Sequence, residues 1–255
     1  MIPIDLHGKT ALVTGAGGEL GRVMARTLAE AGADVILHGF SHMERTERIA
    51  REIGEDTGVR TFAARADVGD LDSVLAMKKE IEEHFALPDI VVTAAVAQYA
   101  WKELLDQPVE DYESQFRTCV LQNVHMAKAF VPHMKERGYG RIVGINTECA
   151  MRCGVTESAY DSGKRGMDGI MRVLAKEVGP FGITVNQVAP GWTVSEKDRL
   201  AHTERAPAYE AGVPLGRRGT DREIANAVLF LASDLASFIT GVYLPVCGGA
   251  EMPAI

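Results

Sequence analysis

The sequence lacks any run of about 20 apolar residues, the length that a helix needs to cross a bilayer. Residues 1–6 contain no basic residue, no long apolar run and no cleavage site, so we expect no signal peptide and a cytoplasmic protein without a membrane partner. Acidic residues outnumber basic ones, 35 to 27, which gives a formal net charge of −8. That balance disfavours nucleic acid and anionic membrane surfaces as partners.

Cysteine is also scarce, with four residues in a chain of 255, and no two of them form a C-x-x-C pair. We therefore expect Cys119, Cys149, Cys153 and Cys247 to be free thiols in a reducing compartment. Cys149 and Cys153 have no histidine or second cysteine pair at ligand spacing, so we predict buried packing and no metal site. The motif G-x-x-x-x-G-K-S/T is absent too, which argues against a nucleoside-triphosphate loop.

Short apolar runs alternate with stretches of helical periodicity along the whole chain, and 46% of the residues are apolar. This alternation predicts an α/β fold, with a single Rossmann-type, doubly wound sheet of seven parallel strands and helices on both faces. No linker, composition shift or repeat divides the sequence, so we expect one domain over residues 1–255. The segment at about 192–219 has prolines and mixed charges, and is expected to be an irregular, lid-like connection.

The individual elements follow from the same periodicity. We predict strands at residues 10–13, 34–38, 59–64, 89–93, 141–146, 182–188 and 241–246. We predict helices at residues 22–31, 44–57, 71–85, 108–137, 159–178 and 221–233. Asp70 is expected to cap the third of these helices.

A glycine-rich turn follows the first predicted strand and precedes the first helix. It contains Gly15, Gly17, Gly18 and Gly21. Glycines let the backbone approach a pyrophosphate closely, and the start of the next helix offers free N–H groups and a positive dipole end. We therefore predict Gly15, Gly17, Gly18 and Leu20 as cofactor-binding residues. The alternative is a tight strand–helix turn that binds nothing.

The end of the second strand bears on the choice between NAD and NADP. An acid about 20 residues after the glycines commonly grips the ribose hydroxyls of NAD. Gly39 stands there instead, followed by Phe40, Ser41 and His42. With Arg45 nearby, these residues favour NADP weakly, and Phe40 and Ser41 are predicted to contact the cofactor. They are equally consistent with a solvated helix start.

Several polar or small residues follow the carboxyl ends of the predicted strands, and these ends meet at one edge of a parallel sheet. Asp67 and Val68 follow the third strand, where an adenine would rest. The full set predicted at this edge is Thr14, Gly39, Asp67, Ala94, Thr147 and Pro190. Its common location predicts a single binding site. Asp67, Val68, Ala94, Pro190 and Thr193 are predicted to bind the cofactor.

Tyr160 and Lys164 lie four residues apart on a predicted helix, so their side chains share one face. A nearby ammonium favours phenolate and is expected to lower the phenol pKa from about 10 toward the range useful for acid–base transfer. Thr147, at the end of the preceding strand, is placed to hold a substrate oxygen against the phenol. The alternative is a surface tyrosine and lysine, because Y-x-x-x-K is common by chance.

Ordered motifs over nearly the whole chain resemble those of the short-chain dehydrogenase/reductase family, close to its 3-oxoacyl-carrier-protein reductase-like branch. They are Thr14-Gly15-x-Gly17 with Gly21, Asp67-Val68, Gly140-Arg141-Ile142-Val143, Tyr160-x-x-x-Lys164, Val185-Asn186-x-Val188-x-Pro190-Gly191, Pro214-Leu215-Gly216-Arg217, Phe230-Leu231-Ala232-Ser233 and Ile239-Thr240-Gly241. The resemblance implies a homotetramer that uses NADP or NAD. It also implies that Tyr160 is the general acid or base, that Lys164 lowers its pKa and holds the nicotinamide ribose, and that Thr147 takes the role of a substrate-positioning serine.

The chain departs from the family pattern at several positions. Glu19 replaces a glycine of the turn, where a carboxylate would repel a pyrophosphate if it faced one. Val96 ends a segment that replaces the usual Asn-Asn-Ala-Gly, and Cys247 replaces a late aspartate. The asparagine that supports a proton-relay water aligns with Cys119, while Asn123 lies one helical turn away.

Two hypotheses follow. The first is an NAD(P)-dependent oxidoreductase that interconverts a secondary alcohol and a carbonyl on a small molecule. The second is a redirected family member, such as a cofactor sensor, a partner subunit or a non-redox acid–base enzyme, with weakened dinucleotide binding. Glu148 and Arg152 suit a polar substrate such as a sugar or hydroxy acid, whereas aromatic residues suit an apolar one. The candidates for the substrate pocket are Gln98, Tyr99, Trp101, residues 148–153, Trp192 and Tyr209.

Overall fold

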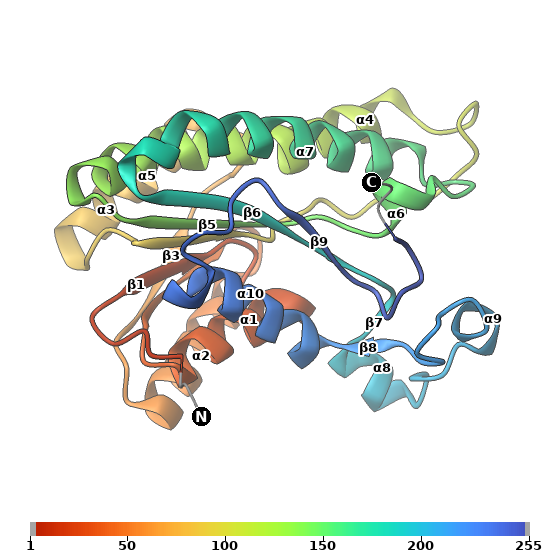
Figure 1. Ribbon diagram of the computed structural model, residues 1–255, viewed down its shortest axis with the longest axis horizontal. Helices are drawn as coiled ribbons and strands as arrows, with labels where there is room; N and C mark the ends of the chain where they lie inside the picture. The colour runs from red at the N-terminus through yellow and green to blue at the C-terminus, as the bar shows by residue number, and fades with distance from the viewer. Residues whose placement is uncertain (1–3, 253–255) are drawn as a thin grey trace.

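A computed structural model of the protein describes residues 4–252. Residues 1–3 and 253–255 of the predicted domain lie outside the described residues, and residues 1–3 are part of the segment in which no signal peptide was expected. The centre of the structure is a seven-stranded, all-parallel sheet in the order β3-β2-β1-β4-β5-β6-β9 (Figure 1). The strands are β1 (Thr10–Val13), β2 (Asp34–Gly39), β3 (Thr61–Arg65), β4 (Ile90–Thr93), β5 (Gly140–Ile145), β6 (Ile183–Pro190) and β9 (Tyr243–Val246). The predicted doubly wound sheet is therefore confirmed.

Helices cover both faces of this sheet (Figure 1). One layer holds α1 (Glu19–Glu30), α2 (Met43–Thr57) and α10 (Asp221–Ala232). The other holds α3 (Leu71–His84), α5 (Gln122–Arg137) and α7 (Ser158–Val178). Two separate apolar clusters result, because alternate residues of a strand point to opposite faces. In β1, Ala11 and Val13 pack against the first layer, and Leu12 packs against the second.

The helix boundaries follow local signals. The Asp70 side chain accepts a hydrogen bond from the Asp72 N–H at 2.9 Å, which confirms the predicted cap of α3. Helix α2 ends at Gly58, whose φ of +76° suits glycine. Helix α1 begins at Glu19, three residues before the predicted start, because the extended backbone ends at Gly18.

The predicted helix over residues 108–137 is interrupted. It comprises α4 (Val109–Gln115), a π-helical segment η1 (Phe116–Leu121) and α5. Within η1, the backbone carbonyl of Cys119 accepts a hydrogen bond from the Asn123 side chain at 2.7 Å. Gly163 of α7 faces this segment, and a Cβ there would lie 3.1 Å from Gln115 Cβ and 3.3 Å from Cys119 Cβ. The π segment thus brings α7 and its tyrosine–lysine pair close to Cys119.

The segment expected to be irregular contains regular structure. It forms β7 (Thr193–Val194), α8 (Glu196–Ala201), α9 (Pro207–Glu210) and β8 (Gly219–Thr220), with β7 and β8 paired in a small sheet. Ser195 and Asp198 form a reciprocal capping box that begins α8. The buried Arg218 donates hydrogen bonds to the carbonyls of Thr193 and Thr203, at 2.9 Å each, and so holds the segment together. This compact unit projects from the carboxyl end of the sheet (Figure 1).

Candidate active site

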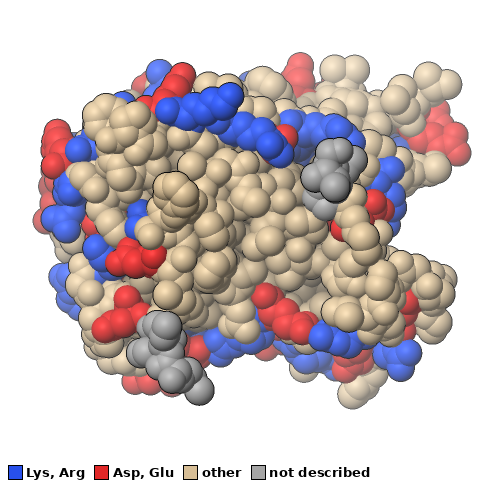
Figure 2. Space-filling view, viewed as in Figure 1, with Lys and Arg blue, Asp and Glu red and all other residues tan. Residues whose placement is uncertain are grey.

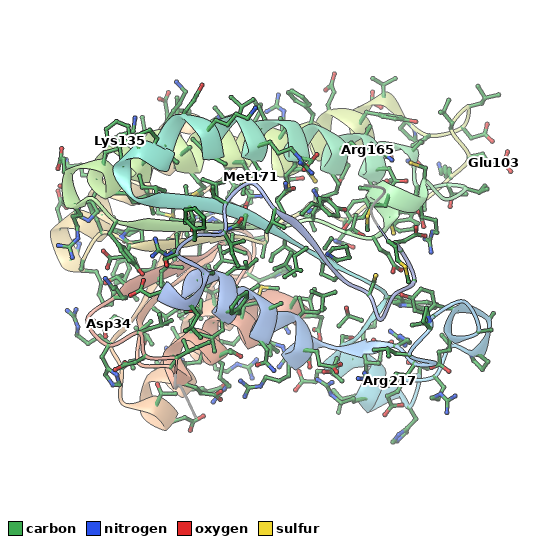
Figure 3. The ribbon with its side chains drawn as sticks, in the orientation of Figure 1. Asp34, Glu103, Lys135, Arg165, Met171 and Arg217 are labelled. Atoms are coloured by element: carbon green, nitrogen blue, oxygen red, sulfur yellow. The ribbon has the colours of Figure 1, made fainter. Side chains whose placement is uncertain are left out.

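The carboxyl ends of the strands border a cavity of about 820 Å³. The opposite, amino edge of the sheet is marked by Asp34 in Figure 3, while Glu103 lies beyond the carboxyl edge on the loop that follows β4. On the carboxyl side the molecular outline is indented between that loop and the α8–α9 unit (Figure 2). The cavity brings together seven of the predicted site residues: Leu20, Ala94, Thr147, Tyr160, Lys164, Pro190 and Thr193.

The other predicted cofactor residues lie around this cavity and do not line it. Phe40 and Ser41 border a separate surface hollow with Arg45 and Arg65. Asp67 lines a third hollow, and Val68 is buried. The remaining predicted positions, Gly15, Gly17 and Gly18, form the turn that leads into α1.

The glycine turn depends on the absence of side chains. Gly15 has a φ of +64°, and a Cβ there would lie 2.9 Å from Ala95 Cα. A Cβ at Gly17 would lie 2.9 Å from Thr46 Oγ1, and one at Gly21 would overlap the Gly15 carbonyl oxygen. The N-terminus of α1 at Gly18 has no side-chain cap, so its N–H groups remain available to an anionic ligand. These features fit a dinucleotide pyrophosphate.

His38, on β2, holds the glycine turn by a hydrogen bond, a role that the sequence did not reveal. Its Nδ1 accepts a hydrogen bond from the Gly15 N–H at 3.2 Å, and its Nε2 lies 2.9 Å from the carbonyl oxygen of Ala66. The first contact requires an unprotonated Nδ1, so the proton sits on Nε2. Burial lowers the pKa of His38, which keeps the ring neutral.

Thr14 joins the glycine turn to the loop after β4. Its hydroxyl oxygen accepts hydrogen bonds from the N–H groups of Ala94 at 2.9 Å and Ala95 at 3.1 Å. The same hydroxyl donates to Gln122 Oε1 at 2.6 Å. The loop that departs from Asn-Asn-Ala-Gly is therefore held in place by this buried threonine.

Glu19 lines the cavity beside the uncapped end of α1. Its carboxylate contacts Arg22 Nη2 at 3.5 Å and Arg45 Nη2 at 3.3 Å. It also accepts a hydrogen bond from the backbone N–H of Lys197, in α8, at 3.4 Å. The two guanidinium groups offset the negative charge, so Glu19 does not oppose a pyrophosphate as an unpaired carboxylate would.

Tyr160 and Lys164 come together as predicted, but the pKa effect differs. Lys164 Nζ lies 5.6 Å from the Tyr160 ring centroid and donates a hydrogen bond to the Ile145 carbonyl at 2.5 Å. Burial raises the pKa of Tyr160, and the thiols of Cys119 and Cys149 act in the same direction. The predicted lowering of the phenol pKa is therefore wrong for this structure, because burial dominates and the ammonium is directed at a backbone carbonyl.

Thr147 is fixed at the end of β5 by its backbone. Its N–H donates to Asn146 Oδ1 at 2.9 Å, and its carbonyl accepts a hydrogen bond from the Tyr243 hydroxyl. Asn146 is held in turn by Gln187 Oε1 at 2.7 Å. Asn146 and Tyr243 are supporting residues that sequence reasoning missed, because their partners come from distant strands.

Comparisons with known proteins agree with this geometry. Residues 15–251 match the family model described as enoyl-(acyl carrier protein) reductase. The 3-oxoacyl-(acyl-carrier-protein) reductase FabG of Aquifex aeolicus is 34% identical over 250 residues, covering 96% of this chain and 98% of that protein. The chain belongs to the short-chain dehydrogenase/reductase family. This chain is an oxidoreductase that acts on alcohol or carbonyl groups with NAD(P).

Two further relatives show the range of this family. The L-rhamnose 1-dehydrogenase (NAD(P)(+)) of a Sphingomonas species is 34% identical over 247 residues, covering 96% of each protein. The crystal structure of a gluconate 5-dehydrogenase from Burkholderia cenocepacia, in complex with NADP and tartrate, has a TM-score of 0.88 at 29% identity and covers 97% of each chain. Within residues 4–252, no helix is long and apolar enough to span a membrane.

In this short-chain dehydrogenase/reductase, Cys119 stands at the position that the sequence resemblance assigns to a relay asparagine, and Asn123 lies one helical turn away. Cys119 is buried in η1, and burial raises the pKa of its thiol. Asn123 accepts a hydrogen bond from Thr93 Oγ1 at 2.7 Å and donates to the Cys119 carbonyl, so both ends of its amide have a protein partner. Neither side chain belongs to the described lining of the cavity.

Aromatic side chains enclose the reacting end of the cavity. The Trp101 ring stacks on Tyr160 with centroids 5.9 Å apart, and the Tyr99 hydroxyl accepts a hydrogen bond from the Tyr160 N–H at 2.8 Å. On the other side, Trp192 and Tyr209 pack edge to face at 5.5 Å. The pocket candidates predicted from the sequence therefore line one cavity, except Ala150, Met151 and Cys153 within the 148–153 segment.

Proposed function

We propose that this enzyme interconverts a secondary alcohol and the corresponding carbonyl on a small molecule, with Tyr160 as the general acid or base. The observation that carries the proposal is the convergence of Tyr160, Lys164 and Thr147 on one cavity beside the glycine turn. Bound nicotinamide would supply or accept the hydride. The protein residues would bind and orient the substrate and move the proton.

The residues have distinct roles in this proposal. The buried phenol of Tyr160 stays protonated at neutral pH and donates its proton to the carbonyl oxygen in the reductive direction. The Lys164 amine, 5.6 Å from the ring, would offset part of the cost of the buried phenolate when the amine is protonated, although burial lowers the pKa of Lys164 as well. Thr147 holds the substrate oxygen, and Trp101 limits access of water to the phenol.

The test is the substitution Tyr160→Phe. Turnover should fall by about 10²- to 10⁴-fold, the usual contribution of a general acid or base, while affinity for the cofactor changes little. Tyr139→Phe is the matched control, since Tyr139 precedes β5 at the opposite edge of the sheet. Retention of activity in the Tyr160 variant, measured by absorbance of the reduced nicotinamide, would remove the mechanism.

For the cofactor, we propose NADP over NAD. Arg45 and Arg65 border the hollow that holds Phe40 and Ser41, where they would attract a 2′-phosphate. An acid cannot replace Gly39 without displacement, because a Cβ there would overlap Thr46 Oγ1. Fluorescence titration should give tighter binding of NADPH than of NADH, and Arg65→Ala should reduce the difference.

The substitutions at Glu19, Val96 and Cys119 favour a second candidate, a redirected family member with weak dinucleotide binding. Glu19 and Val96 line the cavity, and Cys119 leaves the relay position without an amide side chain. The fluorescence titration with NADPH and NADH distinguishes this candidate from the oxidoreductase proposed above. Failure of both NADPH and NADH to bind at millimolar concentrations would favour the second candidate, whereas binding of either cofactor supports the first.

We also propose that the protein assembles as a homotetramer, in part through an apolar groove of about 810 Å³ between α5 and α7. Val173 in this groove is 55% exposed, and the half-buried Val124 and Leu174 extend the apolar surface. A second copy of the same helix pair would cover these side chains. Sedimentation velocity measures the assembly, and a monomer at micromolar concentration would contradict the proposal.

A further inference from the structure

Glu148 is a carboxyl group buried at the wall of the cavity. It directly follows Thr147 in the sequence, and only 2% of its surface is exposed. The nearest cation is Arg152, whose Nη1 lies 3.9 Å from Glu148 Oε1. Burial raises the pKa of Glu148, against the opposing effects of Tyr209 and Arg152. Such a group is costly to bury unless it has a partner.

The surrounding residues hold this carboxyl in a defined position. The Tyr209 hydroxyl donates to Glu148 Oε2 at 3.1 Å and accepts a hydrogen bond from the Trp192 N–H at 3.0 Å. The Glu148 N–H donates to the Pro190 carbonyl at 2.9 Å. A Cβ at Gly191 would lie 2.9 Å from Glu148 Oε2, so glycine makes room for the carboxyl.

The hydrogen-bonding capacity of this group is not exhausted. A carboxylate can accept about four hydrogen bonds. Among residues 4–252, Tyr209 provides the only side-chain hydrogen bond to the Glu148 carboxyl, and the backbone N–H of Trp192 is a further neighbour that favours its charged form. A hydroxyl group of a ligand in the cavity would supply an additional donor, next to the Thr147 position that holds the reacting oxygen.

The charges around the cavity favour a neutral ligand over an anion. Besides Glu148, the lining includes Glu19 and Glu157. The guanidinium of Arg152 is already paired with Glu157 at 2.6 Å, and Lys164 is directed at the Ile145 carbonyl. A substrate carboxylate or phosphate beside Glu148 would therefore find no uncommitted cation among the described lining residues, and would face a carboxyl group whose nearest guanidinium is 3.9 Å away.

We propose that Glu148, positioned by Tyr209, determines specificity for a neutral polyhydroxylated substrate, by accepting a hydrogen bond from a hydroxyl adjacent to the reacting carbon. This inference rests on the proposed oxidoreductase function. The aromatic rings of Trp101 and Trp192 would contact the apolar C–H faces of such a substrate. A β-ketoacyl chain would leave the carboxyl of Glu148 without this donor.

The test compares cyclohexanol with cis-1,2-cyclohexanediol, which share a ring and differ by one hydroxyl. The wild-type enzyme should prefer the diol in kcat/KM. In Glu148→Ala the ratio of diol to cyclohexanol should fall by about 10- to 100-fold, the usual value of a hydrogen bond to a charged group. Tyr209→Phe should lower the same ratio by a smaller factor, because the carboxyl remains but loses its positioning contact.

Glu157→Gln is the matched control. It removes one carboxylate charge from the same cavity, but the oxygens of Glu157 are engaged by Arg152 at 2.6 Å and by the Gly154 N–H at 3.1 Å. The ratio should therefore stay near the wild-type value in this variant. An equal fall in the Glu157 and Glu148 variants would indicate a general charge effect and overturn the proposal. An unchanged ratio in Glu148→Ala, with native circular dichroism, would also overturn it.

A second measurement separates failure of this inference from failure of the proposed function. Both tryptophans of the chain line the cavity, so intrinsic fluorescence reports ligand binding there. If neither alcohol is oxidised with either cofactor, the oxidoreductase proposal fails. Fluorescence titration with a neutral aldose and its aldonate then decides the role of Glu148. Tighter binding of the aldose, lost in Glu148→Ala, supports it, and equal or tighter binding of the aldonate overturns it.

Discussion

The two halves of the cavity are built by different means. On the side of β1, β2 and β4, buried side chains accept hydrogen bonds from backbone N–H groups. His38 accepts one from Gly15, and Thr14 accepts one from Ala94. On the side of β5, β6 and the α8–α9 unit, long side chains meet across the chain, as Tyr209 meets Glu148. The first half fixes a backbone shape that many dinucleotide-binding proteins need, and the second half adapts through side chains.

The largest expected effect on the first half comes from adding a methyl group to the glycine turn after β1. Gly21→Ala would place a Cβ against the Gly15 carbonyl oxygen. We expect a loss of about 2–3 kcal/mol in the free energy of unfolding, from overpacking of backbone against backbone. Cofactor affinity should fall in parallel, because the turn must shift. Chemical denaturation and fluorescence titration measure both effects.

Gly219→Ala is the control for that substitution. A Cβ at Gly219 would come no closer than 3.9 Å to a neighbouring atom, Glu223 Oε2, and its φ lies outside the left-handed region. This variant should stay within about 0.5 kcal/mol of the wild type. Equal stability of the two alanine variants would show that the turn is not tightly constrained.

Lowering the pH should reduce the free energy of unfolding by a smaller amount, through His38 in the first half. The folded-state pKa of His38 lies below the ordinary histidine value of about 6.5, so the unfolded chain binds the proton more readily. Its contribution to stability is present above pH 6.5 and is lost as pH falls, at about 1.4 kcal/mol per pH unit while the folded ring stays neutral. His38→Gln should remove this part of the pH dependence in denaturation curves. The exposed His84→Gln should leave it in place.

The second half should respond to pH with the opposite sign. Burial, together with the neighbouring Glu157, raises the pKa of Asp161 to about 7. Asp161 Oδ1 is buried without a hydrogen-bond partner, and Cys149 Sγ and a Glu157 carboxylate oxygen lie within 4.8 Å of the group. Because the folded pKa is raised, this residue supports the fold at low pH and that support is lost as pH rises through 7.

Asp161→Asn tests that sign. The variant should be more stable than the wild type at pH 8, and the difference should shrink toward pH 5, where the wild-type carboxyl is protonated in the folded state. Thermal unfolding across this range measures it. A difference that grows on acidification would contradict the assignment.

The same contrast explains what could be predicted from the sequence. The seven-stranded parallel sheet, the glycine turn, the Asp70 cap and the meeting of Tyr160 with Lys164 depend on local periodicity and short motifs, and all are present. Capping signals at Ser195 and Asp198 were also available, but the prolines and charges of that segment obscured them.

Other features depend on residues far apart in the chain. Tyr243 supports Thr147 across 96 positions, and His38 supports Gly15 across 23. The high pKa of Tyr160 results from burial by all of its neighbours, which the spacing to Lys164 does not report. The π-helical segment at Phe116–Leu121 lies inside a stretch with ordinary helical periodicity, so its register change was not visible.

Glu19 links the two halves of the cavity, because its carboxylate accepts a hydrogen bond from the Lys197 N–H, 178 positions along the chain. Arg22 adds a second link, since its guanidinium pairs with Glu196 at 3.2 Å. These contacts are partly open to solvent, and the Debye length shrinks from about 8 Å at physiological ionic strength to about 3 Å at 1 M salt. The α8–α9 unit is thus attached to the glycine turn by forces that dissolved ions weaken, whereas the buried contacts of Thr14 and His38 are shielded from them. Concentrated salt should therefore loosen the entrance of the cavity and leave the turn itself in place.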